Sequence, residues 1–463
     1  MHIRRVGSVL ALALLVAAAP RPAAALERLC DPSFENCRTE LLSLIDNERQ
    51  EIDVGFWFME DTRYVQHIVA RKNAGVRVRL LVDPRGDASS PTNQSILDAF
   101  ASSGVPMRKR VAGSILHWKM MLFGGQHVVE FSGANYSDNA WHPVTAYSNY
   151  VDESIYFTSD PEIVNSFMRK FDDSWVDTTN YANYANVHST PVRSYPLFSI
   201  DPALNFPPGQ SYATRSLNLY AKETSGIDVA MYRITQQSHA DAMISAVAHG
   251  VPVRLITEPN EYRNPARLWD SWNVDRMWRG GVKIRMRAHA GLSHQKSVIL
   301  HSLHTVIFGS SNWTSPSDNS QQEHNYFVAD KSWMLTWFID QFNRKWNNST
   351  GIAETKAFTP LPPDRPVYKT PADGASGVSR TVKLSWYGGP WAHYYDIYIG
   401  TSSTPPLVAS NKHLGPSEST SQRQSYTVPF TLAPNTTYYW KVVSKTAASK
   451  TASGPVWYFR TGS

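Results

Sequence analysis

Residues 114–135, SILHWKMMLFGGQHVVEFSGAN, and residues 291–312, GLSHQKSVILHSLHTVIFGSSN, share one spacing of polar residues. In each stretch a lysine follows a histidine by two residues, and an asparagine follows the same histidine by eighteen. Apolar runs fill most of the intervening positions in both stretches. An arrangement built twice in one chain indicates a duplicated unit, because chance similarity would not preserve both intervals.

The likeness between the two stretches extends well beyond them. The tripeptide IDV occurs at 52–54 and again at 227–229, and AGVRVRLLVD (74–83) recurs as HGVPVRLITE (249–258), both displaced by 175 residues. The histidines and asparagines of the opening stretches are displaced by 177. The sequence therefore predicts a domain-length duplication of about 170 residues.

Each copy alternates β-rich apolar segments with helical patterns. In DTRYVQHIVARKNAG (61–75), Asp61 is placed to cap a helix and Gly75 to end it, and an apolar strand follows. Strands alternating with helices predict an α/β fold with a mostly parallel sheet in each half. We therefore expect two duplicated α/β/α sandwich halves, over residues 26–195 and 196–357, side by side around a pseudo-two-fold axis.

The last hundred residues have a different character. The segment FTPLPPDRPVYKT (358–370) is rich in proline and is typical of an extended linker. Residues 371–463 consist of short alternating runs separated by turn residues, which predicts a small antiparallel all-β sandwich. The run LAPNTTY (432–438) looks like a tyrosine corner and, with Trp386, makes this region resemble a fibronectin type III domain.

Residues 1–25 have the features of a secretory signal peptide. They contain two early arginines, an apolar run of about eleven residues that is too short to span a bilayer, and an Ala-x-Ala ending. We therefore expect an exported, secreted protein.

Cys30 and Cys37 are its two cysteines, and in an oxidising compartment they predict one local disulfide. The alternative, half of a metal site, lacks a second cysteine pair.

The duplicated motif places polar side chains on one face of a strand. Residues i and i+2 of a strand share a face, so His117 and Lys119 point together. A turn at 124–125 would bring the returning strand, and with it Asn135, back beside them. The second copy supplies the corresponding residues His294, Lys296 and Asn312. Two sets of histidine, cation and amide across an interface suit an anionic, tetrahedral group such as a phosphodiester.

This set of residues predicts phosphoryl transfer through a covalent intermediate. One imidazole, if neutral, can attack phosphorus to form a phosphohistidine, and the other, if protonated, can protonate the leaving oxygen. The lysines and asparagines would stabilise charge on the non-bridging oxygens, so no metal or other cofactor is required. Glu153 and Glu323 lie downstream in each copy, where they could hold the second ring nitrogens. Trp141 and Trp313, just behind the asparagines, could wall the substrate groove or pack in the core.

The motifs HWK…SGAN and HQK…GSSN resemble the paired HxK and GSxN motifs of the phospholipase D superfamily, over residues 38–348. The resemblance implies a site at the interface of the two halves, with His117 as nucleophile and His294 as general acid. It also implies no metal cofactor and assigns Ser310 to substrate binding.

Three positions depart from the family pattern. Gly124 and His301 stand where the family has an aspartate five residues after the lysine, and Gly133 replaces the serine of the first copy. Strand geometry puts the first two positions at the far end of each hairpin, which bears on folding more than on phosphate chemistry. The glycine removes one hydrogen-bond donor. The two histidines, lysines and asparagines remain intact.

Composition helps to rank the possible functions. The chain has 463 residues, 42% hydrophobic and 18% charged, and a net charge of +6 that falls to about +3 when three signal-peptide arginines are removed. A protein that held many DNA phosphates would carry a dense basic stripe, and none is present. We therefore place a secreted phosphodiesterase acting on phospholipid head groups first. Aromatic residues near the motifs, Trp118 and Tyr136 among them, could accept such a substrate.

Two alternatives remain open from the sequence. One is a secreted endonuclease, because the same site can cleave any accessible phosphodiester. The other is a non-catalytic surface-binding protein in which the C-terminal sandwich does the work, although intact motifs in both halves argue against it. The expected partners are a phospholipid or other phosphodiester and a membrane surface, with nucleic acid as the alternative substrate. We expect a monomer.

Overall fold

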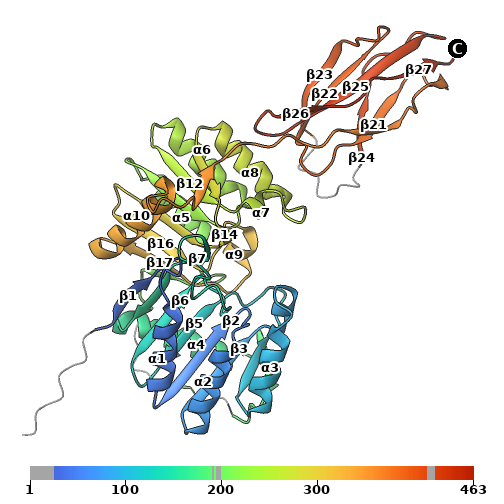
Figure 1. The fold of residues 1–463 in the computed structure, drawn as a ribbon. Coiled ribbons are helices and arrows are strands. Elements are labelled where there is room, and N and C mark those ends of the chain that lie inside the picture. Colours follow the sequence, from blue (N-terminus) through green and yellow to red (C-terminus); the bar gives the residue numbers. More distant parts are fainter. Residues whose placement is uncertain (1–24, 190–191, 194–199, 414–422) are drawn as a thin grey trace, which may run out of the picture.

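The computed structural model describes residues 25–189, 192–193, 200–413 and 423–463. The predicted signal peptide, apart from its last residue, and the predicted junction between the halves lie outside the described residues. In Figure 1 the first α/β half (blue to green) and the second (green to orange) lie side by side, and the C-terminal β domain (orange to red) stands beyond the second half.

The first half is built on an eight-stranded sheet with the order β1-β8-β6-β5-β2-β3-β4-β9. Helices α1, α2 and α3 pack against one another, and α4 packs against β5 and β6. The bounds are β1 (Glu27–Cys30), α1 (Cys37–Asn47), β2 (Glu51–Phe56), α2 (Thr62–Asn73), β3 (Arg77–Val82), the 3-10 turn η1 (Pro84–Ala88), α3 (Asn93–Ser102), β4 (Met107–Arg110), β5 (Lys119–Phe123), β6 (Val128–Ser132), β8 (Ile155–Thr158), α4 (Pro161–Val176) and β9 (Tyr181–Ala185).

The second half repeats this order strand for strand, as β10-β17-β16-β15-β11-β12-β13-β18. Its elements are β10 (Leu204–Asn205), α5 (Tyr212–Tyr220), β11 (Ile227–Met231), α6 (Gln237–Ala248), β12 (Val253–Thr257), α7 (Pro259–Tyr262), α8 (Leu268–Arg279), β13 (Lys283–Arg287), β15 (Lys296–Leu300), β16 (Thr305–Gly309), α9 (Ser315–Asn319), β17 (Asn325–Ala329), α10 (Ser332–Asn347) and β18 (Thr355–Ala357). The duplication seen in the sequence is therefore a duplication of topology.

Each sheet is mixed, which corrects the expectation of mostly parallel sheets. Only β2-β3-β4 and β11-β12-β13 run parallel, and the other neighbours within the two sheets are antiparallel. A parallel pair needs a crossover connection, and helices supply one between β2 and β3, β3 and β4, β11 and β12, and β12 and β13. The motif strands β5 and β6 instead form a hairpin, as do β15 and β16.

The helix predicted within 61–75 shows how local sequence sets these elements. Helix α2 begins after Asp61, whose side chain accepts a hydrogen bond from the Arg63 N–H, as an N-cap residue does. The chain leaves the helix through Gly75 at φ +92°, a conformation that glycine adopts without a steric penalty. The capping residue and the glycine therefore lie where the sequence pattern predicts them.

The two halves share one buried core. Phe131 of β6 and Phe308 of β16 stack with ring centroids 5.9 Å apart and an interplanar angle of 4°, and helices α4 and α10 contribute to the same cluster. A short two-stranded sheet crosses the interface, in which β7 (Asn149–Asp152) pairs in parallel with β14 (Ala290–Ser293). Because backbone pairing and core are common to both halves, the residues at their interface are held as one rigid unit.

The C-terminal domain is all-β. One sheet has the order β19-β21-β24, and the other β20-β27-β25-β22-β23 with β26 beside β25. The Ala433 N–H donates to the Tyr438 hydroxyl at 3.0 Å, the contact expected of a tyrosine corner, and the likeness to fibronectin type III stays a prediction. The bounds are β19 (Val367–Thr370), β20 (Ala375–Val378), β21 (Lys383–Tyr387), β22 (Tyr394–Gly400), β23 (Leu407–His413), β24 (Arg423–Thr427), β25 (Thr437–Lys445), β26 (Thr451–Ser453) and β27 (Trp457–Thr461).

Two further features complete the fold. Cys30 and Cys37 form a disulfide that joins the end of β1 to the start of α1. Among the described residues, no helix combines the length and the apolar character that crossing a bilayer requires.

Candidate functional site

The two hairpins deliver the predicted residues to the interface between the halves. His117 and Asn135 flank the hairpin of β5 and β6, and His294 and Asn312 flank that of β15 and β16. All four side chains line one cavity of about 380 Å³. Each sheet supplies one histidine and one amide, so the site exists only where the two halves meet.

The two lysines lie beneath this cavity and are buried. Lys119 Nζ donates to the backbone carbonyl of His117 at 2.8 Å, and Lys296 Nζ donates to that of His294. Each lysine thus fixes the backbone at the histidine two residues before it. Each amino group is thereby held next to the histidine of its own motif.

The carboxylates cross the interface. Glu323 of the second half accepts a hydrogen bond from His117 Nδ1 at 2.8 Å, and Glu153 of the first half contacts His294 Nδ1. The sequence placed one glutamate downstream in each copy but did not reveal this exchange. Because a carboxylate only accepts, Glu323 fixes the Nδ1–H tautomer of His117 and leaves Nε2 with a free lone pair.

The environments of the two carboxylates differ. The Ser310 hydroxyl donates to Glu323, so Ser310 positions a carboxylate, and the substrate contact that the family resemblance implied stays a prediction. Gly133, the counterpart of Ser310, lies against Glu153, and a Cβ atom there would come within 2.7 Å of its Oε2. Glu153 lacks the hydroxyl donor, and Lys296 Nζ lies 2.9 Å from the same His294 nitrogen. The protonation states of the Glu153 carboxyl, the His294 imidazole and the Lys296 amine are therefore coupled to one another.

Burial of four cationic groups in one place depresses their pKa values. Burial lowers the pKa of His117 to about 4, against the opposing charge of Glu323, and the pKa of Lys296 to about 8. Burial, and then the charges of Lys296 and Lys119, hold the pKa of His294 well below its ordinary value. Burial also raises the pKa of Glu153 to about 8. The site is thus short of negative charge, which a bound phosphate would supply.

The asparagine side chains provide a second indication that this site binds a ligand. The Oδ1 atoms of Asn135 and Asn312 are buried and have no hydrogen-bond partner among the described residues. A buried amide without a partner is costly, and it is satisfied when a ligand binds. In the amide orientation that presents nitrogen, each side chain can donate to a phosphoryl oxygen.

The tryptophans occupy the second of the two places that the sequence left open, the core. Trp141 and Trp313 are fully buried and line neither the large cavity nor the smaller one beside it. Trp141 Nε1 donates to the backbone carbonyl of Asn135 at 3.0 Å, and Trp313 stacks on His239. Trp141 thus supports Asn135 from the core. Trp118 and Tyr136 are also buried, and large aromatic rings stabilise most when fully buried.

The cavity walls come instead from residues that immediately follow the first duplicated strand. Trp57 and Phe58 follow β2, and Tyr232 and Arg233 occupy the equivalent places after β11, each displaced by 175. The duplication itself was the signal that could have identified them, since the carboxyl ends of the parallel strands lie beside the motif hairpins. Ser89, Arg267, Leu292 and Thr314 are among the other lining residues.

A smaller cavity of about 280 Å³ adjoins the first. Phe58, Asn135, Leu292 and His294 line both. Ala140 and Val151 add apolar surface to the smaller one. A substrate at the histidines can therefore extend in two directions, into a polar compartment and into a more apolar one.

Two of the three positions that depart from the family pattern, Gly124 and His301, lie away from the cavity. Gly124 packs against the side chain of Glu51, and His301 Nε2 lies 2.8 Å from Asp228 Oδ2, both at the far ends of the hairpins. Their contacts are structural.

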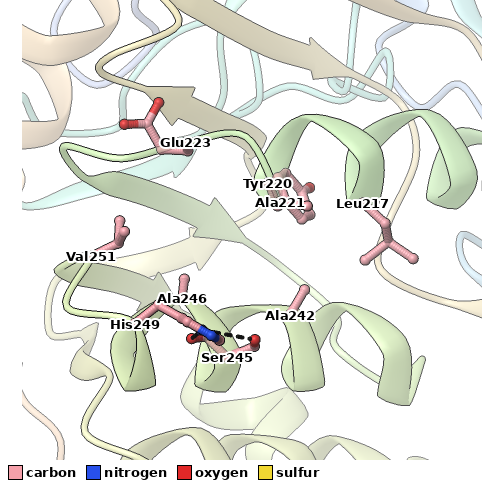
Figure 2. Close-up of a pocket in the computed structure, with 9 residues that line it drawn as sticks. All are labelled: Leu217, Tyr220, Ala221, Glu223, Ala242, Ser245, Ala246, His249 and Val251. Atoms are coloured by element: carbon pink, nitrogen blue, oxygen red, sulfur yellow. Dashed lines mark hydrogen bonds between the residues drawn. The ribbon is translucent and has the colours of Figure 1, made fainter.

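A separate cavity of about 310 Å³ lies between α5 and α6 (Figure 2). Its carboxylate, Glu223, and its histidine, His249, already have partners. The Glu223 carboxylate accepts hydrogen bonds from the backbone N–H groups of residues 224–226, and His249 Nδ1 bonds to the Ser245 carbonyl. It contains none of the duplicated polar residues and offers no chemistry comparable to that of the interface.

Comparison with known proteins places the two α/β halves in a family. The sequence model of a family described as "Cardiolipin synthase, PLD-like domain" matches residues 41–175 and 220–346, together more than half of the chain. The chain belongs to this phospholipase D-like family. Both matched segments contain one histidine, lysine and asparagine of the site.

Individual relatives are distant. A mitochondrial cardiolipin hydrolase of Chlamydomonas reinhardtii is 22% identical over 134 residues, which span 29% of this chain and 57% of that protein. The phosphatidylserine synthase of Haemophilus influenzae Rd KW20 superposes with a TM-score of 0.52 at 13% identity, over 72% of this chain and 89% of that one. The polyphosphate kinase of Porphyromonas gingivalis gives 0.50 at 14%, over 74% and 52%. These likenesses show the fold of the phospholipase D-like region.

Proposed function

We propose that this phospholipase D-like protein is a secreted, monomeric phosphodiesterase that removes head groups from phospholipids without a metal ion. The observation that carries the proposal is the pair of histidines facing one cavity, each held by a carboxylate from the opposite half. The predicted signal peptide supports export. The relatives support a lipid substrate through their names, which include a cardiolipin hydrolase and a phosphatidylserine synthase.

The asymmetry of the two carboxylates supports His117 as the nucleophile. Its Nδ1 proton is held by Glu323, which the Ser310 hydroxyl supports in turn, so Nε2 keeps its lone pair for attack. Attack at phosphorus forms the N–P bond as the head-group oxygen leaves with the proton of His294. Water then attacks the phosphohistidine and gives a proton to His294. The N–P bond breaks, and phosphatidic acid is released.

Binding of the substrate allows His294 to take up the proton that this sequence requires. In the free protein both histidines have depressed pKa values because they share a buried site with two lysines. A diester anion between them offsets that positive charge and raises the pKa of His294, which then holds the proton that the leaving group needs. Lys119, Lys296 and the two asparagine amides stabilise the non-bridging oxygens as charge accumulates on them.

The cavity walls favour lipid over nucleic acid. Trp57, Phe58 and Leu292 give it an apolar side, and Ala140 and Val151 continue that surface in the adjoining cavity. The low net charge of the chain points the same way, since tight DNA binding depends on many basic contacts to phosphate.

A side-by-side assay tests the proposal. Phosphatidylcholine vesicles, single-stranded DNA and duplex DNA are each incubated with the protein in EDTA. We expect release of free choline that persists in the chelator, and a transphosphatidylation product when a primary alcohol is added. DNA cleavage that falls with salt, without vesicle activity, would establish the nuclease instead. Loss of activity in EDTA that zinc or calcium restores would refute the metal-free mechanism.

A further inference from the structure

The two sides of the active-site cavity are chemically unequal although they are built from duplicated elements. Where the first half places Phe58, the second half places Arg233, 175 residues later. Where Thr92 caps α3 in the first half, Arg267 occupies the N-cap position of α8, again 175 residues later. The second half therefore contributes two guanidinium groups to the cavity lining, beside Tyr232, whereas the first half contributes the aromatic residues Trp57 and Phe58.

The two arginines are not equivalent. Arg233 is neutralised by Glu261, with Nε 2.7 Å from Oε2. Arg267 forms no ion pair with a carboxylate in the described parts of the chain, and its side chain donates to the backbone carbonyl of Ala266 at 2.9 Å. Burial, and then the charge of Arg233, lowers the pKa of Arg267. One side of the cavity therefore has a guanidinium group without a carboxylate partner.

The position of Arg267 is unfavourable for folding. Helix N-caps favour Ser, Thr, Asp and Asn, which accept hydrogen bonds from the first turn, and the Arg267 side chain provides no such cap. A cation at a helix N-terminus also opposes the helix dipole. An arginine that weakens its own helix, repels its neighbour and borders the catalytic cavity is better explained by an anionic ligand than by stability.

We propose that Arg267 binds a second anionic group of the substrate, a phosphate or carboxylate within the head group, beside the phosphodiester that is cleaved. This inference rests on the proposed function and narrows its substrate class to phospholipids with an additional negative charge in the head group. Arg233 and the Thr314 hydroxyl border the same compartment.

The second anion belongs to the leaving group. Arg233, Arg267 and His294 line the same cavity, so the arginines share it with the histidine that protonates the leaving oxygen. The aromatic side, with Phe58 and the adjoining apolar cavity, is then available to the diacylglycerol portion. The unequal walls set the direction in which an amphipathic diester enters.

A matched pair of ligands tests the subsite without requiring turnover. Propyl phosphate and propane-1,3-diyl bisphosphate differ by the second phosphate, and their affinities are measured by titration calorimetry at fixed pH and ionic strength. We expect the full-length protein to bind the bisphosphate at least tenfold more tightly. Arg267→Ala should reduce this ratio to about threefold or less, and Arg267→Lys should retain part of it.

The control removes a charge from the same helix. Arg279 lies exposed at the last residue of α8, away from the cavity, and Arg279→Ala should keep the wild-type ratio. Circular dichroism establishes that each variant is folded. An equal ratio in wild type and Arg267→Ala, or an equal drop in Arg279→Ala, would overturn the subsite.

Kinetics then separates the subsite from the proposed function. Dihexanoyl phosphatidylcholine and dihexanoyl phosphatidylglycerophosphate are compared as monomers, so that vesicle charge plays no part. We expect wild type to favour the second, chiefly through KM, and Arg267→Ala to lose that preference. Tighter bisphosphate binding with no lipid cleavage would refute the proposed function and leave the subsite standing. Cleavage of both lipids with equal kcat/KM would refute the subsite and leave the function standing.

Discussion

At the residue scale, the site works through pairs that span the interface. His117 depends on Glu323 and His294 on Glu153, so neither half contains a complete histidine–carboxylate pair. We expect His117→Ala and His294→Ala each to reduce kcat at least ~10³-fold, and the double variant to be little worse, because both groups serve one reaction sequence. Single-turnover rates with bis(p-nitrophenyl) phosphate provide the measurement. Two active single variants with a much weaker double variant would mean two independent sites.

The depressed histidine pKa values predict an unusual pH dependence. In the free protein the reactive form has His117 neutral, above a pKa of about 4, and His294 protonated, below a pKa that lies well under its ordinary value. We therefore expect kcat/KM, which reports the free protein, to fall already as pH rises towards neutrality. The alkaline limb of kcat should lie at higher pH, because bound diester raises the pKa of His294.

The test is a pair of pH profiles measured with one soluble diester. Coincident alkaline limbs for kcat and kcat/KM would show that substrate binding does not raise the pKa of the acid. An alkaline limb near pH 8 in both would point to deprotonation of Lys296, whose pKa lies at about 8.

At the element scale, the short sheet of β7 and β14 is what aligns the halves. Gly291 in β14 has φ +96°, and a Cβ atom there would collide with the Tyr150 backbone carbonyl. Nearby, Lys345 of α10 donates to Asp152 of β7 at 2.8 Å. His294 follows β14 directly, so the position of the proposed acid depends on this crossing pair.

Gly291→Ala should therefore disturb both stability and activity. We expect a loss of about 1–3 kcal/mol beyond the ordinary cost of alanine at positive φ, and at least a tenfold fall in kcat/KM. Gly250→Ala is the matched control, because Gly250 has φ +86° and a Cβ atom added there would meet nothing within 4 Å. Urea unfolding and diester hydrolysis are measured for both. Equal losses of stability in the two variants would show that the crossing pair tolerates the substitution.

At the scale of the whole molecule, the C-terminal sandwich contributes no residue to either cavity at the catalytic interface within the described parts of the chain. It nevertheless contacts the second half, where Trp272 of α8 stacks on His413 with ring centroids 5.1 Å apart. The linker is also engaged, since the Leu361 N–H donates to the Tyr262 hydroxyl at 3.3 Å. The sandwich is thus attached to the catalytic halves without completing their site.

These contacts determine where the chain can be truncated without loss of stability or activity. A chain ending at Asp364 should retain kcat/KM on bis(p-nitrophenyl) phosphate within about twofold. A chain ending at Ala357, the boundary suggested by sequence, loses the buried Phe358 ring and about 1.5–3 kcal/mol of stability. Removal of the sandwich exposes the Trp272 ring, so both shorter chains also carry Trp272→Gln. Inactivity of the folded chain ending at Asp364 would show that the sandwich supports the site from a distance.

The sequence by itself determined the duplication, the hairpins and the six residues that carry the proposed chemistry. Those features are local or periodic: the alternation of side chains along a strand, the capping of α2 by Asp61 and the equal spacing of two motifs are all visible in one dimension. The same periodicity could have located Trp57 and Arg233.

Only the tertiary structure decided how the copies cooperate. The exchange of Glu153 and Glu323 depends on the way two sheets pack, and strand patterns carry no information about a partner more than a hundred residues away. Packing likewise placed Trp141 and Trp313 in the core and left Arg267 facing the cavity, because burial is a property of the assembled halves. The chain encodes two similar units, and their different contacts at one interface make the site asymmetric.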